Sequence, residues 1–124
     1  MSDAGPRRDL PHVDTAPLRE LFAGEVESRL PQMTAARAAL VADGDIEAAR
    51  ELRRHAHTLA SSAAVLGEDL AADEARRCEA DLQPYVDGDA DRVPADAARS
   101  AAAALDTLVV LLAPWLLEGG DRGH

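Results

Sequence analysis

The chain has 124 residues and a formal net charge of −10, with 47% hydrophobic but only 2% aromatic residues. This length suits one domain and leaves no room for separate cofactor and substrate domains. The acidic balance argues against a nucleic-acid partner, because such proteins neutralise phosphates with a basic face. A core of Leu, Val and Ala favours helices, since Ala and Leu lead the helix scale. We therefore expect an all-α protein that does not bind nucleic acid.

Both ends of the chain are rich in Pro, Gly and charged residues without periodicity. We expect disordered tails at 1–13 and 119–124 around one domain at 14–118. Residues 1–13 lack the apolar run of a signal peptide. The most apolar stretch, Leu108 to Leu117, is shorter than the roughly 20 residues that a membrane-spanning helix needs. These features predict a cytoplasmic protein without a membrane contact.

Hydrophobic periodicity predicts four helical segments between the tails. The first, at about 15–42, is expected to divide at Pro31, because an interior proline removes a backbone donor. This division gives a short extra N-terminal helix and a longer helix that begins at Pro31. The other helices are expected at about 45–66, 68–85 and 94–117. Their lengths and short connections predict an antiparallel up-and-down four-helix bundle.

The apolar stripes of these helices predict which residues face the core. Leu18 and Leu21 fall on the stripe of the first segment. Cys78 falls on the stripe of the third long helix, so we expect a small buried hydrophobe, and a single cysteine excludes an internal disulfide. The last helix carries apolar residues outside its main stripe: Val110, Leu111 and Leu117. Either the short first helix covers them or they contact another chain; we expect a monomer.

The sequence lacks the common catalytic and metal-binding motifs. It has no Gly-rich phosphate loop and no His-Glu-x-x-His. Asp87, Asp89 and Asp91 have the spacing of a calcium loop, but Arg92 stands where such a loop needs Gly. His55 and His57 point about 200° apart on a helix and cannot share a metal ion. We predict no metal site.

His57 is the most informative residue, because the helical wheel places it on the exposed side of its helix. Three arginines lie within two turns before it: Arg50, Arg53 and Arg54. Three small residues follow it: Ala60, Ser61 and Ala64. Guanidinium groups offset phosphoryl charge, and a neutral imidazole nitrogen can accept and release a phosphoryl group. By geometry alone, an ordinary surface histidine on an Arg-rich face is the alternative.

The stretch from His57 to Gly67 reads His-Thr-Leu-Ala-Ser-Ser-Ala-Ala-Val-Leu-Gly. It resembles the signature of histidine-containing phosphotransfer (HPt) domains, H-x-L-K-G-S-S/A-x-x-x-G. A helix that opens at Pro31 and ends at Gly44-Asp45 also matches the spacing common in that family. The resemblance covers about residues 15–117. In two places the chain departs from the signature: Ala60 replaces its Lys, and Ser61 replaces its Gly.

The resemblance implies a phosphoryl carrier rather than a turnover enzyme. His57 would accept a phosphoryl group from an aspartate of one receiver domain and pass it to another. The partner would be the receiver domain of a response regulator or hybrid histidine kinase, and the chain itself would need no cofactor, since the Mg²⁺ belongs to the receiver.

Within this interpretation, the residues around His57 have two roles. Arg53, Arg54 and Ser61 would stabilise the phosphoryl group. Arg50, Ala60 and Ala64 would form the docking face. The departures at positions 60 and 61 leave an alternative, a degenerate module that docks on a receiver or kinase without being phosphorylated.

Overall fold

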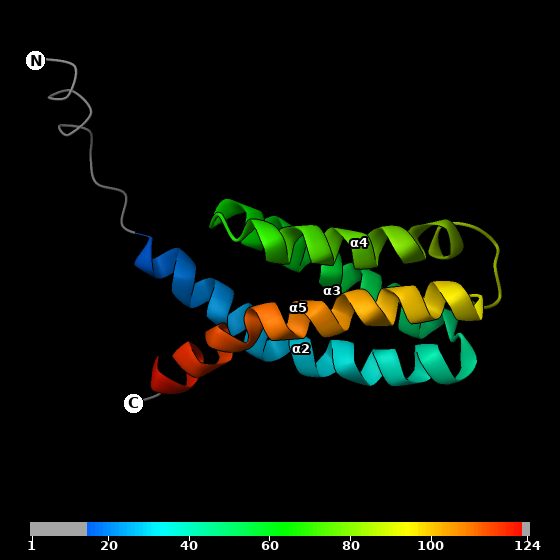
Figure 1. Ribbon diagram of the computed structural model, residues 1–124, viewed down its shortest axis with the longest axis horizontal. Coiled ribbons are helices and arrows are strands. Elements are labelled where there is room, and N and C mark those ends of the chain that lie inside the picture. The colour runs from blue at the N-terminus through cyan, green and yellow to red at the C-terminus, as the bar shows by residue number, and fades with distance from the viewer. Residues whose placement is uncertain (1–14, 123–124) are drawn as a thin grey trace, which may run out of the picture.

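The structure, a computed structural model, describes residues 15–122 as four helices: α2 (Ala16–Asp43), α3 (Ile46–Val65), α4 (Asp69–Val86) and α5 (Ala95–Arg122). Each helix packs on two others, in the ring order α2, α3, α4, α5 (Figure 1). The connections are short, so neighbours run antiparallel. The predicted all-α up-and-down four-helix bundle is thus confirmed. The tail expected at 1–13 lies outside the described residues.

The core consists of aliphatic side chains separated by alanines. Every helix contributes buried alanines, which allow helix axes to approach closely. At one end of the bundle the ring of Phe22 meets that of Trp115 edge to face, with 4.7 Å between ring centroids. The largest fully buried side chains are Phe22, Met33, Leu40, Leu52, Leu59, Leu82, Leu105, Leu108 and Leu112.

Pro31 does not divide the first helix. α2 is continuous from Ala16 to Asp43, so the prediction of a short extra N-terminal helix is wrong. Pro31 is exposed, and its missing N–H costs one helical hydrogen bond on the solvent side. Leu30 and Met33, on either side of it, are both buried in the same core. Packing of this shared apolar stripe holds the two halves in one helix.

The α2–α3 turn is fixed by Gly44 and Asp45. Gly44 adopts a left-handed φ of 65°, and a Cβ at this position would collide with the backbone of Val93. The Gly44 carbonyl accepts a hydrogen bond from the Val93 N–H at 2.8 Å, which ties the turn to the α4–α5 loop. The Asp45 side chain caps α3 by accepting from the N–H groups of Glu47 and Ala48.

α5 is longer than the sequence predicted. It continues to Arg122, where an end near Leu117 was expected. By length and composition the segment Ala95–Leu117, with a mean hydropathy of 1.8, is apolar enough to cross a membrane, whereas the sequence analysis considered only Leu108 to Leu117. The inward side of the segment is nevertheless part of the bundle core. We therefore treat α5 as the fourth helix of the bundle.

His55 is the one buried polar residue among those whose exposure the structure describes, and it lies between α3 and α2. Arg29 of α2 donates from Nη1 to its Nδ1 at 2.8 Å. Its Nε2 lies 3.7 Å from a carboxylate oxygen of Glu51. Burial lowers the pKa of His55 below 6.5, and the nearby positive charges of Arg54 and Arg29 lower it further. The bundle therefore favours a neutral His55.

This burial predicts an acid-sensitive stability. Below pH 6.5 an unfolded His55 binds a proton that the folded bundle disfavours, so the free energy of unfolding falls as the pH drops from 7 towards 5. The contribution is at most about 1.4 kcal/mol per pH unit. His55→Asn keeps an acceptor near the Nδ1 position and cannot titrate. Urea unfolding across this pH range should show a shallower decline for the variant, and an unchanged decline would contradict the assignment.

Cys78 lies in the core as predicted, and burial raises the pKa of its thiol to about 12. We expect the folded chain to react with a thiol reagent such as dithionitrobenzoate more than about a hundredfold slower than a free thiol, because the thiolate forms only after local opening. The same chain in guanidinium should react at once. Rapid reaction without denaturant would mean that α4 leaves the bundle readily.

Candidate functional site

His57 lies on the exposed side of α3, as the sequence predicted, with 64% of its side chain exposed. His55, two residues earlier, is buried on the opposite side of the same helix. This arrangement agrees with the predicted opposite orientation of the two rings and prevents them from sharing a ligand. Of the two histidines in the described part of the chain, His57 is therefore the one that a second protein can reach.

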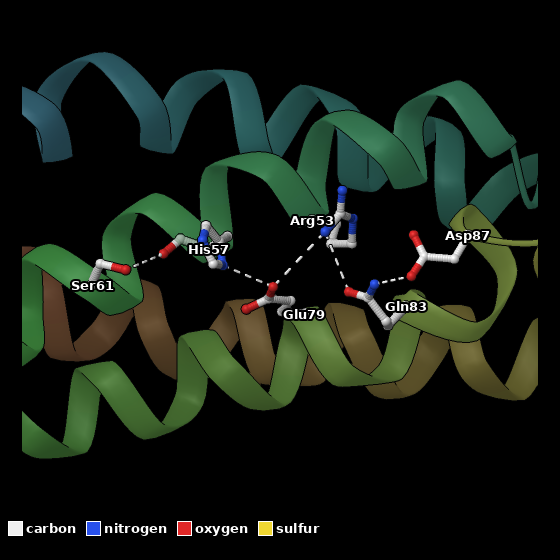
Figure 2. Close-up of polar contacts among 6 residues, drawn as sticks. All are labelled: Arg53, His57, Ser61, Glu79, Gln83 and Asp87. Carbon is white, nitrogen blue, oxygen red and sulfur yellow. Dashed lines mark hydrogen bonds and ion pairs between the residues drawn. The ribbon is translucent and has the colours of Figure 1, made fainter.

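A carboxylate on the neighbouring helix holds the His57 ring. Nδ1 of His57 lies 2.9 Å from Oε2 of Glu79 on α4, whose side chain is only 20% exposed (Figure 2). A carboxylate oxygen can only accept a hydrogen bond, so Nδ1 carries the hydrogen. In the neutral ring the lone pair is then on Nε2. The contact thus presents a nucleophilic nitrogen on the free edge of the ring.

Glu79 continues into a line of polar contacts along the α3–α4 interface. Arg53, one turn before His57, places Nη1 3.9 Å from the same Oε2 of Glu79. This nitrogen also donates to Oε1 of Gln83 at 3.3 Å. Gln83 in turn donates to the carboxylate of Asp87. Figure 2 shows these contacts as one row from Asp87 to His57, and a further contact joins the His57 backbone to Ser61.

The small residues after His57 occupy different surroundings. Ser61 is exposed one turn later, and its hydroxyl donates to the backbone carbonyl of His57 at 3.2 Å. Ala64 is also exposed. Ala60, in contrast, is only 3% exposed, so its predicted place on the exposed docking face is wrong. On the helical wheel Ala60 is on the same side as Arg53, which contacts α4, and this packing explains its burial.

The three arginines predicted to surround the histidine do lie together. Arg50, Arg53 and Arg54 line one shallow hollow on the part of α3 that precedes His57, and His57 itself is not part of the lining. The other lining residues are Glu47, Glu51 and Val86. Arg50 forms an ion pair with Glu47 on the same helix. Arg54 is exposed and forms no ion pair within residues 15–122. The guanidinium groups of Arg50 and Arg54 are thus at the surface, whereas that of Arg53 is directed towards α4.

An apolar cleft borders the same face, and the sequence analysis missed it. It has a volume of about 200 Å³ and is lined by Leu18, Leu21, Phe22, Glu25, Ser62, Val65 and Leu66. Leu18, Leu21 and Val65 are 42%, 68% and 70% exposed, so the prediction that the two leucines face the core is wrong. The first turns of α2 extend beyond the ends of α3 and α4 (Figure 1), and Arg19 in these turns stacks on the ring of Trp115 of α5.

The sequence analysis also missed Glu79. It follows Cys78 at the edge of the buried stripe of α4 and is partly exposed. In the sequence, nothing distinguishes it from other acidic residues at such positions. Its proximity to His57 depends on the register between two antiparallel helices, which hydrophobic periodicity does not specify. The one sequence signal for a role of Glu79 was an acidic side chain next to the core stripe of α4.

The comparisons with known proteins agree with this geometry. The Hpt domain family matches residues 17–113, which is most of the chain and includes every residue of the site described above. No curated protein and no solved structure matches the chain significantly. Hpt domains have a phosphotransfer role in two-component phosphorelays and interact with receiver domains. The chain, with its four-helix bundle and exposed His57, belongs to the Hpt domain family.

Proposed function

We propose that this chain is a phosphorelay intermediate that carries a phosphoryl group on Nε2 of His57 between the aspartates of receiver domains. The observation that carries the proposal is the 2.9 Å contact between Nδ1 and Glu79. It leaves an unprotonated nitrogen on the exposed edge of the ring, where a partner's aspartyl phosphate can approach in line. The α5 helix packs within the bundle, which supports a cytoplasmic carrier.

The transfer step balances without a proton acceptor at Nε2. The lone pair of Nε2 forms a bond to phosphorus while the bond between phosphorus and the donor's aspartyl oxygen breaks, and those electrons leave with the donor carboxylate. Nδ1 keeps its proton and its hydrogen bond to Glu79 throughout the step. The ring of the phosphohistidine therefore carries a positive charge, which lies beside the Glu79 carboxylate. Reversal of the same step onto a second receiver's aspartate releases the phosphoryl group.

The charges near His57 suit a phosphoryl group even though the whole chain is acidic. Arg54, three residues before His57, exposes a guanidinium group that forms no ion pair within residues 15–122, and Arg50, two turns before the ring, exposes one that is paired with Glu47. Ser61 has a hydroxyl one turn from the ring, and it could exchange its backbone acceptor for a phosphoryl oxygen. These three groups would replace the Lys of the family signature, because the corresponding Ala60 has neither charge nor exposure.

The docking face of a receiver would include the apolar cleft. Val65 follows His57 by about two turns on the exposed side of α3, and Leu18 and Leu21 line the same cleft from α2. An exposed apolar cleft one to two turns after His57 suits a partner that buries an apolar surface of its own. Ser61 and Ala64 between the ring and the cleft are small enough to permit a close approach.

Phosphotransfer from receiver domains tests the proposal. A panel of phosphorylated receiver domains of the same organism would be mixed with the full chain and with His57→Gln. We expect acid-labile, base-stable label on the wild type and none on the variant. Wild-type label that persists in the variant would contradict the assignment of His57. Binding without label would favour the second candidate, a docking module that is not phosphorylated. The observation behind this candidate is Ala60 in place of the Lys of the family signature.

The cleft is tested with a pair of matched substitutions. Val65→Asp adds a charge to the cleft, so affinity for the cognate receiver should fall by about tenfold or more. Val110→Asp is the control, because Val110 is equally exposed on α5, which does not contact α3. Calorimetric titration with the receiver should separate the two variants. Equal losses, or none at Val65, would place the docking face elsewhere.

A further inference from the structure

Arg53 differs from the other two arginines in the direction of its charge. Its side chain is 30% exposed, against 45% for Arg50, and its Nη1 contacts two residues of α4. The shorter of these contacts, 3.3 Å to Gln83, is a hydrogen bond, and the longer, 3.9 Å to Glu79, is an ion pair. Its guanidinium is therefore engaged along the interface instead of being free for a phosphoryl group.

The same oxygen of Glu79 serves both Arg53 and His57. Oε2 lies 2.9 Å from Nδ1 of His57 and 3.9 Å from Nη1 of Arg53. A glutamate side chain has several rotatable bonds, and the exposed His57 ring is a weak restraint on it. Arg53 supplies a second restraint, which is itself held by Gln83. Removal of Arg53 would leave the carboxylate free to turn into solvent.

We propose that Arg53 is a positioning residue that acts on His57 through Glu79, rather than a ligand of the phosphoryl group. The inference rests on the proposed function, in that Nε2 of His57 is taken as the phosphoryl acceptor. Arg53 keeps the Glu79 carboxylate against Nδ1, and this contact keeps the ring hydrogen on Nδ1 and the lone pair on Nε2. The phosphoryl charge is left above all to Arg54, because Arg50 is paired with Glu47 on its own helix.

The tautomer of His57 is the direct readout of this role. ¹⁵N-histidine NMR of the full chain at neutral pH distinguishes a ring protonated on Nδ1 from one protonated on Nε2. We expect the Nδ1–H tautomer in the wild type and a shift towards the Nε2–H tautomer in Arg53→Met, which keeps the aliphatic stem. Arg54→Met is the matched control, with the same loss of charge one residue away, and should retain the wild-type tautomer.

A double-mutant cycle tests whether Arg53 acts through Glu79. Glu79→Ala alone should lose the tautomer preference, and Arg53→Met should then have no further effect in the Glu79→Ala background. Additive effects of the two substitutions would overturn the proposal, as would a wild-type tautomer in Arg53→Met. Arg53→Lys should restore part of the preference, since an ammonium can pair with Glu79 but cannot hold Gln83 with the same fork.

Chemical phosphorylation connects the tautomer to the reaction. Phosphoramidate, a small phosphoryl donor, replaces the receiver, so the rate of His57 labelling does not depend on docking. Arg53→Met should label severalfold more slowly than the wild type, whereas Arg76→Met, which removes an exposed arginine of α4 outside the site, should label at the wild-type rate. A wild-type rate in Arg53→Met would overturn the proposal. The two proposals fail separately. If receivers never label His57, the relay function fails, but the NMR cycle still decides the role of Arg53.

Discussion

The packing of α3 against α4 is the constraint on which the site depends. Buried alanines on both helices, among them Ala63 on α3 and Ala75 on α4, permit close approach of the two backbones. At this separation a glutamate at the margin of α4 reaches the histidine ring on α3. A larger side chain at either alanine would move the helices apart and lengthen the contact between Glu79 and His57. The reactive nitrogen is thus oriented by the core.

The elements that could be predicted from the sequence are those set by local periodicity. The four helices, the exposure of His57 and the burial of Cys78 all follow from one apolar stripe per helix. Pro31 was misread because the cost of one helical hydrogen bond is local, whereas the packing that offsets it, through Leu30 and Met33, involves the whole bundle. Local rules overestimate such interruptions.

The contacts between helices could not be predicted in the same way. Glu79 reaches His57 only because of the register of α4 on α3, and a shift of one turn would place another residue there. The cleft at Leu21 and Val65 lies where the longer α2 meets the C-terminal end of α3, and the stripe of α2 does not reveal this difference in length. Ala60 was misplaced for a similar reason, since the width of the α3–α4 contact decides its burial.

The electrostatics of the site are local and largely independent of the net charge. Arg50 forms an ion pair with Glu47, and Arg53 forms one with Glu79. Acidic and basic groups therefore alternate along this face. The exposed pair of Arg50 and Glu47 contributes little to stability, about 0–1 kcal/mol. These ion pairs mainly orient the side chains. They direct the guanidinium group of Arg53 towards α4 and leave that of Arg50 at the surface.

The two histidines of α3 show how partner chemistry assigns a proton. Arg29 is only a donor, so Nδ1 of His55 must accept and its neutral ring carries the hydrogen on Nε2. Glu79 is only an acceptor, so Nδ1 of His57 must donate and its neutral ring carries the lone pair on Nε2. Identical side chains two residues apart thus have opposite tautomers. The buried ring serves the contact between α2 and α3, and the exposed ring presents a nucleophile.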